Sequence, residues 1–231
     1  RPPRPRPLHP LVHSPLVSNS LTNVLTFAVL GFMGVRLVTG LRRSRSTEGR
    51  SIVAAVVHNI GWRHVWPVPL LLTAVIAVAT ALVQVPGLSW GWWSMLGGIG
   101  NPVFGDSDAT AGTVLEWIIP LTFMALLLPA LPLFAYAEER MFRTGAQRWA
   151  RGRRTLKVLQ FGMIHVIIGI PIGAAMALSI GGAYFMWVYL RAFRVHQSEH
   201  AATIESTTAH TVYNGLLVIL VLLAITLDAV L

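Results

Sequence analysis

The chain has 231 residues, of which 54% are hydrophobic and 12% charged, whereas a soluble domain carries about 25% charged residues. This composition excludes an ordinary soluble domain and predicts an integral membrane protein, and the absence of cysteine excludes disulfides, cysteine nucleophiles and cysteine metal ligands. The net charge of +9 comes from clustered arginines, which indicate membrane topology and, without a nucleic-acid motif, no nucleic-acid partner.

The chain begins with a proline- and arginine-rich stretch, residues 1–16, which is expected to be disordered. Six apolar segments follow, and each is expected to be helical because a membrane-spanning helix needs about 20 mostly apolar residues. The predicted fold is therefore all-α, a polytopic transmembrane helical bundle with about six membrane helices. These segments are 17–38, 65–85, 113–137, 156–170, 172–192 and 208–230.

The fourth and fifth segments come from one apolar stretch, 156–193, which is too long for one span and too short for two. Pro171 divides it, because proline removes a backbone donor and ends or kinks a helix. Several glycines in this stretch are expected to permit close contact between helices. They are Gly169, Gly173, Gly181 and Gly182.

The arginines orient these segments in the membrane. Three connections are basic, those after the first, third and fifth segments, whereas residues 86–112 hold no Lys or Arg and carry Asp106 and Asp108. The positive-inside rule puts the basic connections on the cytoplasmic side and 86–112 outside. This alternation leaves the N-terminus outside despite its three arginines, because five basic residues in the next connection outweigh them. Arginine in place of lysine suggests a GC-rich bacterium, so the expected location is the bacterial inner membrane.

Two adjacent glutamates, Glu138 and Glu139, follow the third apolar segment. Ionisable groups at a membrane boundary are costly and are usually functional. If the helix continues, Glu139 and Arg143 form an i, i+4 ion pair with the acid N-terminal, the favourable order. Glu138 points about a quarter-turn away and stays free for chemistry.

Two further polar pairs follow at the same i, i+4 spacing. Phe161 and His165 stand one helical turn apart, and so do His210 and Asn214. The orientation deduced from the arginines brings both histidines and Glu138 toward the cytoplasmic half of the bilayer. Each pattern alone is more often a solvated charge pair or a helix contact, but the combination in one order and at similar depth favours a site.

The chemistry available to this set is hydrolysis. A glutamate can act as a general base on water, with a histidine to hold the water or pass the proton. A second histidine and an asparagine amide can donate hydrogen bonds to a developing oxyanion. A metal interpretation uses the same groups, since Glu138, His165 and His210 could ligate zinc with one position left open.

The three motifs resemble those of the CPBP family, which contains CAAX prenyl proteases and bacteriocin-processing (Abi) proteins. That family carries Glu-Glu-x-x-x-Arg, Phe-x-x-x-His and His-x-x-x-Asn on successive membrane helices. All three stand here, at Glu138 to Arg143, Phe161 to His165 and His210 to Asn214. Gly181 to Tyr184 is similar to the small-residue helix between the second and third motifs. The resemblance spans roughly 121–220.

The resemblance implies an intramembrane glutamate-type endopeptidase with a CPBP-like catalytic core in 113–231, preceded by two N-terminal helices in 17–112. By the resemblance, Glu138 activates water together with His165, and His210 and Asn214 form the oxyanion site. Supporting residues would be Glu139, Arg143 and Phe161. No cofactor is expected, and zinc is the less favoured alternative.

The expected partners are membrane lipid and a substrate, either a leader-bearing peptide or a membrane protein. Bacteria generally lack CAAX prenylation, which argues against a prenylated substrate. The alternative function is a non-catalytic scaffold, immunity protein, assembly factor or accessory subunit, which would bind partner subunits of a membrane complex. In that case the polar residues would only hold helices together.

One segment departs from the family pattern. The connection 191–209, which contains Glu205, is longer and more polar than the family's usual short turn. It is expected to be a solvated cytoplasmic loop, and a substrate-gating or partner-binding loop is the alternative. Asn59 and His64 precede the second apolar segment and are expected to lie at the membrane interface.

Overall fold

A computed structural model of the chain describes residues 15–95 and 113–230. All regular structure in these two ranges is helical, which confirms the all-α prediction for the described part of the chain. Within these described ranges four segments are long and apolar enough to cross a membrane, compared with about six predicted for the whole chain. The four are Trp62–Val83, Pro120–Arg148, Ile172–His196 and Glu199–Leu227.

The N-terminal third contains two helices that the sequence analysis did not predict, α2 (Thr47–Asn59) and the single-turn α3 (Trp62–Val65). Its other helices are α1 (Pro15–Ser44) and α4 (Pro67–Val83). The connection between the first two apolar segments therefore contains most of α3 and the longer α2. Ser46 caps α2 by accepting a hydrogen bond from the backbone N–H of Gly49, and Ile52 and Val56 form its buried i, i+4 stripe. Of the stretch expected to be disordered, Pro15 and Leu16 belong to α1, and residues 1–14 lie outside the described range.

The third apolar segment extends further than predicted. After the short α5 (Trp92–Met95), α6 runs from Leu115 to Phe142 and passes through its three prolines without ending. The predicted end was Ala137, so the two glutamates lie inside the helix instead of after it. Asp106 and Asp108, which the topology prediction used, lie outside the described residues.

The fourth apolar segment is an α-helix over only part of its predicted length and continues as 3₁₀ helix. A 3₁₀ turn η2 (Ala146–Arg148) leads into α7 (Arg151–Met163), which begins in the arginine cluster, and η3 (Ile164–Ile168) continues as 3₁₀ helix. Helix α7 packs closely on α8 because Gly162 has no side chain. A Cβ at Gly162 would overlap the backbone oxygen of Ala175 and the hydroxyl of Ser179. This close approach fixes the position of Phe161 and His165.

The prediction of a solvated loop at 191–209 is wrong. Helix α8 (Ile172–His196) continues through its first part, and α9 (Glu199–Val230) begins only three residues later. Gln197, with a left-handed φ of 50°, ends α8. The start of α9 is helical because its small and hydroxyl residues are buried between other helices, including Ala202 and Ser206.

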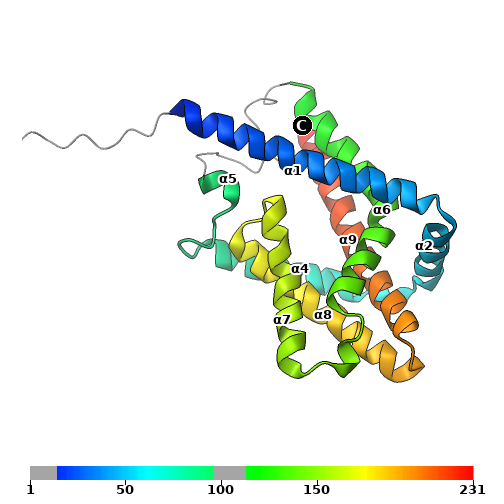
Figure 1. Cartoon of the computed structure of the whole chain (residues 1–231). Helices are drawn as coiled ribbons and strands as arrows, with labels where there is room; N and C mark the ends of the chain where they lie inside the picture. The colour runs from blue at the N-terminus through cyan, green and yellow to red at the C-terminus, as the bar shows by residue number, and fades with distance from the viewer. Residues whose placement is uncertain (1–14, 96–112, 231) are drawn as a thin grey trace, which may run out of the picture.

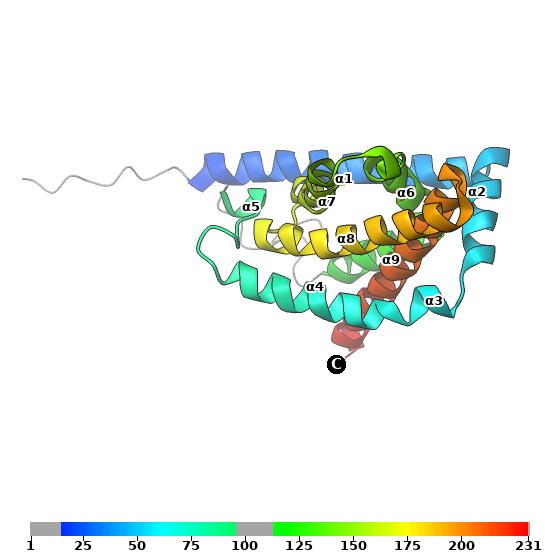
Figure 2. The ribbon, with the colours of Figure 1, turned by 90° about the horizontal axis from the view of Figure 1, so that it is seen from below.

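Helix α8 is the centre of the bundle. It packs against α4, α7 and α9, and α9 packs in turn against α6. Helix α1 lies across α6, and α2 contacts the start of α9. In both views α5 lies at one end of the molecule and α2 at the other (Figure 1, Figure 2). The N-terminal helices are therefore part of the same packed unit as the region from α6 onward.

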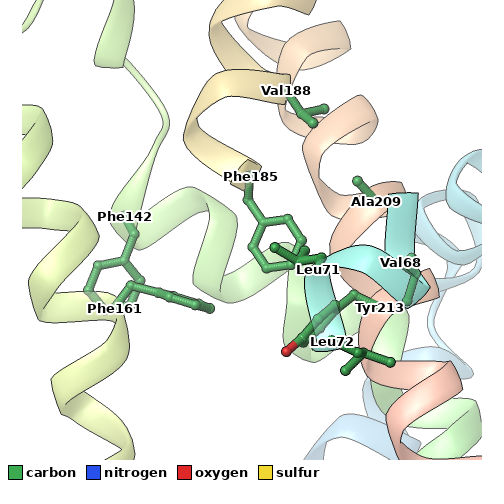
Figure 3. Packing of buried hydrophobic residues seen from close by; sticks show 9 residues of the cluster. All are labelled: Val68, Leu71, Leu72, Phe142, Phe161, Phe185, Val188, Ala209 and Tyr213. Atoms are coloured by element: carbon green, nitrogen blue, oxygen red, sulfur yellow. The ribbon is translucent and has the colours of Figure 1, made fainter. Parts of the chain in front are cut away.

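A core of buried aromatic side chains lies where α6, α7, α8 and α9 meet. Phe161 makes edge-to-face contacts with Phe142 and Phe185, at ring-centroid distances of 5.7 and 6.0 Å. Phe185 also contacts Tyr213 at 5.7 Å, and α4 contributes Val68 to the same cluster (Figure 3). This core supports the polar groups of α6 and α9.

Candidate active site

Helix α6 turns its two adjacent glutamates in different directions. The side chain of Glu139 is completely buried, whereas that of Glu138 is 31% exposed. Consecutive residues on an α-helix are about 100° apart, so one faces α9 while the other faces a cavity. The difference in burial separates a structural carboxylate from an accessible one.

Glu139 is bound by donors from two helices. Arg143 Nη1 lies 2.6 Å from Glu139 Oε1, which is the i, i+4 pair expected from the spacing. His210 Nδ1 lies 2.9 Å from the same oxygen, and the Ser206 hydroxyl donates to Oε2. Ser206 also lies 2.9 Å from the backbone oxygen of Phe185. Glu139 therefore joins α6 to α9.

The Arg143 guanidinium lies over two aromatic rings. Its Cζ is 4.3 Å from the centroid of Phe161 and 5.3 Å from that of Phe185, distances typical of cation–π contacts. Within the described residues, Arg143 Nε and Nη2 have no hydrogen-bond partner. Phe161, predicted as a supporting residue, thus covers the arginine that pairs with Glu139.

His210 connects the two glutamates. Its ring stacks on Phe185 at 4.4 Å, and its Nε2 lies 3.7 Å from Glu138 Oε2. Since an ionised Glu139 can only accept, His210 Nδ1 must carry a hydrogen. Nε2 then donates only when the ring is an imidazolium; in the neutral ring it is an acceptor.

His165 is oriented by its own helix turn. Its Nδ1 lies 2.9 Å from the backbone oxygen of Phe161 and 3.2 Å from that of Gly162. Because carbonyl oxygens only accept, Nδ1 carries the hydrogen and Nε2 of a neutral ring is a lone-pair acceptor. The ring centroid is 5.5 Å from that of Phe161, so the predicted pair is in contact even though His165 lies on 3₁₀ helix.

Three of the four residues predicted to be catalytic line one cavity of about 370 Å³. Its polar groups come from Glu138, His165 and Asn214, and from Arg36 of α1. His210 is almost completely buried behind Glu138. Oε2 of Glu138 is buried and has no hydrogen-bond partner within the described part of the chain. The remaining lining is mostly apolar: Phe32, Met33, Arg36, Leu37, Phe123, Leu127, Leu131, Phe134, Met141, Ile164, Ile167 and Ile168.

The zinc alternative uses Glu138, His165 and His210. In residues 15–95 and 113–230 no three histidine, aspartate or glutamate side chains form a group that could hold a metal ion. The zinc alternative stays a prediction.

Sequence analysis missed three contributors to this region. Ser206 binds Glu139 and stands one helical turn before His210, a spacing that was hidden because this segment was predicted to be a loop. Phe185, which stacks on His210, carried no motif signal beyond its place in an apolar run. Arg36 of α1 lines the cavity with its guanidinium 5.9 Å from the Phe134 ring centroid, and an arginine inside an apolar helix was a usable signal.

Comparison with known proteins gives no relative for this chain. No protein-family model matches it, and neither a curated protein nor a solved structure does. What the described residues establish is an all-helical protein with four candidate membrane-spanning helices and a polar cluster between α6, η3 and α9.

Proposed function

We propose that this chain is an intramembrane endopeptidase of the CPBP type, acting in the cytoplasmic half of a bacterial inner membrane. The observation that carries the proposal is the shared cavity of Glu138, His165 and Asn214. In it, Glu138 Oε2 is buried, has no hydrogen-bond partner among the described residues, and lies 3.7 Å from His210 Nε2. A buried carboxylate oxygen without a hydrogen bond costs free energy, and such groups are usually functional.

In the proposed reaction Glu138 is the general base. A water in the cavity donates one hydrogen to Glu138 and the other to Nε2 of His165. The water oxygen attacks the carbonyl carbon of the scissile peptide bond while Glu138 takes its proton. The amide of Asn214 donates a hydrogen bond to the oxyanion, and an imidazolium His210 can do the same from Nε2. Glu138 then passes its proton to the leaving nitrogen as the carbon–nitrogen bond breaks.

Glu139 and Arg143 act as positioning residues in this scheme. Glu139 holds Nδ1 of His210 at 2.9 Å, so that Nε2 is directed toward Glu138. Arg143 balances the charge of Glu139 at the back of the site. One carboxylate is thereby neutralised by a permanent cation, and its neighbour stays available to take a proton.

The proposed substrate is an apolar peptide segment. Most of the cavity lining is aliphatic or aromatic, from α1, α6 and η3. A volume of about 370 Å³ lies in the range of small-ligand sites, which suits a few side chains of a leader peptide or a membrane protein. The cavity therefore favours cleavage of membrane-associated chains over soluble polar ones.

The decisive test compares Glu138→Gln with the unsubstituted protein in liposomes and in native membranes. We expect Glu138→Gln to fold and insert normally and to abolish cleavage. Glu48→Gln is the matched control, because Glu48 is an exposed glutamate paired with Arg43 away from the cavity. New protein termini are mapped by mass spectrometry across the membrane proteome. If well-folded unsubstituted protein yields no terminus that depends on Glu138, the protease proposal fails.

The alternative is a non-catalytic membrane scaffold, and the buried network favours it specifically. Glu139, Arg143, His210 and Ser206 join α6 to α9 whether or not any reaction occurs. In a scaffold, Glu138→Gln would leave the cellular phenotype and the partner complex intact, while disruption of Glu139 would remove both. Measuring both variants in the same strain therefore separates the two functions.

A further inference from the structure

A second cavity, of about 310 Å³, lies between α3, α8 and α9 and takes no part in the proposed reaction. Its lining is unusually rich in cationic and ring-nitrogen side chains. The groups that matter for binding are Arg63, His64, Trp187, Arg191, His196 and Glu205. His64 is buried inside the protein.

The one carboxylate in this cavity has no capacity left for a ligand. Arg63 donates to both oxygens of Glu205, from Nε at 2.9 Å and from Nη2 at 3.1 Å. Asn59 Nδ2 lies 2.9 Å from Oε2, and His64 Nε2 lies 3.1 Å from Oε1. Each oxygen therefore accepts two hydrogen bonds, and the charge of Glu205 is balanced by Arg63.

His64 is neutral in this arrangement. The backbone N–H of Gly61 donates to His64 Nδ1 at 3.2 Å, so Nδ1 has a lone pair and the hydrogen is on Nε2, which donates to Glu205. His64 thus adds no charge. The pair of Arg63 and Glu205 contributes a net charge of zero to the cavity.

Arg191 is the uncompensated cation of the cavity. Its Cζ lies 5.3 Å from the ring centroid of Trp187, and none of the described residues forms a hydrogen bond or an ion pair with it. His196 adds a second ring with nitrogen at the rim. A ligand complementary to this surplus of donors is an anion with several acceptor oxygens.

The cavity also lies where lipid headgroups are expected. Its lining residues come from the beginning of the span Trp62–Val83 and from the C-terminal half of the span Ile172–His196. Three exposed tryptophans surround this level, Trp62, Trp66 and Trp187, and tryptophan is enriched at the membrane–water boundary. The same end carries the basic connections that the charge pattern assigns to the cytoplasmic side, the side on which basic pockets bind anionic lipids.

We propose that the cavity lined by Arg63, Arg191 and Trp187 binds the phosphate headgroup of an anionic phospholipid from the cytoplasmic leaflet. Arg191 supplies the charge, and the free donors of Arg63 and the ring of His196 complete the headgroup contacts. Trp187 carries the guanidinium on its face and lies beside the acyl chains. This site is separate from the Glu138 cavity and does not depend on the protease proposal.

The test measures binding of a short-chain phosphatidylglycerol to the full-length protein in a neutral detergent. The matched pair of variants is Arg191→Gln and Arg194→Gln. Arg194 lies on the same exposed end of α8 and does not line the cavity, and among the described residues its side chain donates only to the backbone oxygen of Leu190. We expect Arg191→Gln to weaken binding roughly tenfold, as loss of a charge-assisted hydrogen bond does, and Arg194→Gln to change it less than about twofold.

Three outcomes overturn the proposal. Equal losses from the two variants indicate general attraction of a basic surface, which supplies about 1 kcal/mol per arginine. Equal affinity for phosphatidylcholine and phosphatidylglycerol removes the requirement for an anionic headgroup. Displacement of the lipid by millimolar inorganic phosphate identifies free phosphate as the ligand. Arg191 is exposed, so unchanged helical content of Arg191→Gln in neutral detergent is expected and excludes misfolding as the cause.

Discussion

Glu139 and Glu205 are held by the same kinds of partner, an arginine and a histidine, but in different surroundings. Glu139 and Arg143 are fully buried, whereas the Arg63 side chain that pairs with Glu205 is 62% exposed. The carboxylate of Glu205 is saturated by four donors. In the buried cluster, by contrast, two Arg143 nitrogens and Glu138 Oε2 have no hydrogen-bond partner among the described residues.

This contrast separates two kinds of polar cluster: the one around Glu205 holds helices together, and the one around Glu138 and Glu139 can also take part in a reaction. Both oxygens of Glu205 already accept two hydrogen bonds each, so this cluster only joins α3 to α9. The neighbouring Arg191 keeps its donors for a ligand. The buried cluster provides Glu139 with hydrogen-bond donors, whereas Oε2 of its neighbour Glu138 has no hydrogen bond among the described residues and lies beside a cavity. Removing one partner of a buried ion pair costs far more than removing one of an exposed pair, and four predictions test that contrast.

The largest effect is expected for Arg143→Met. It leaves the Glu139 carboxylate buried beside apolar rings and should lower the free energy of unfolding by about 3–5 kcal/mol. Unfolding in mixed micelles, followed by circular dichroism, measures this change. The double variant Glu139→Gln with Arg143→Met should recover part of the loss, because no buried charge remains uncompensated. A loss below about 1 kcal/mol in the single variant would mean that the buried pair behaves as an exposed one.

The second prediction concerns the packing that holds Phe161 over Arg143. Gly162→Ala forces a methyl group against Ala175 and Ser179 of α8 and should cost about 1–3 kcal/mol, as overpacking does. Gly152→Ala in the same helix is the control, since no neighbouring atom lies within 4 Å of the position that its methyl group would take. It should be neutral or stabilising by up to about 1 kcal/mol, and both variants are compared by thermal unfolding. Equal effects of the two substitutions would show that α7 does not depend on close contact with α8.

The third prediction compares one hydroxyl from each cluster. Ser206→Ala removes the donor to Glu139 and should cost about 1–3 kcal/mol, because the acceptor is charged and buried. Thr208→Val removes the acceptor for Asn59, whose amide keeps its bond to Glu205, so we expect about 0.5–1 kcal/mol. Thermal unfolding of the two variants under identical conditions ranks them, and a reversed order would contradict the contrast between the clusters.

The smallest effect is expected for Arg63→Gln. The pair with Glu205 is bidentate but largely exposed on the arginine side, so its loss should cost at most about 1 kcal/mol and should shrink as salt is raised. Arg43→Gln, which breaks the more exposed pair with Glu48, should change stability by less than about 0.5 kcal/mol. The free energy of unfolding of both variants is measured in low and in high salt. A large, salt-independent loss for Arg63→Gln would show that the ion pair of Glu205 behaves as a buried pair, like that of Glu139.

Much of the helical framework could be predicted from the sequence, because apolar runs of about 20 residues signal helices without knowledge of their neighbours. The ion pair of Glu139 with Arg143 was also predictable, since i, i+4 spacing fixes two side chains on one helix face. The start of α9 was not. Its polar composition suggested a loop, and only its burial between α6, α8 and α2 explains why it is helical.

Composition and local helix geometry were enough to specify the all-α class, the separation of the two glutamates around α6, and the candidate residues of the site. The packing of the helices was needed to show that Glu138, His165 and Asn214 share a cavity, that His210 lies behind it on Phe185, and that α1 contributes to the wall. It also brought Arg63 and Arg191, which are far apart in the chain, to one cavity. Contacts between distant segments follow from the packing of complete helix faces, which no local pattern specifies.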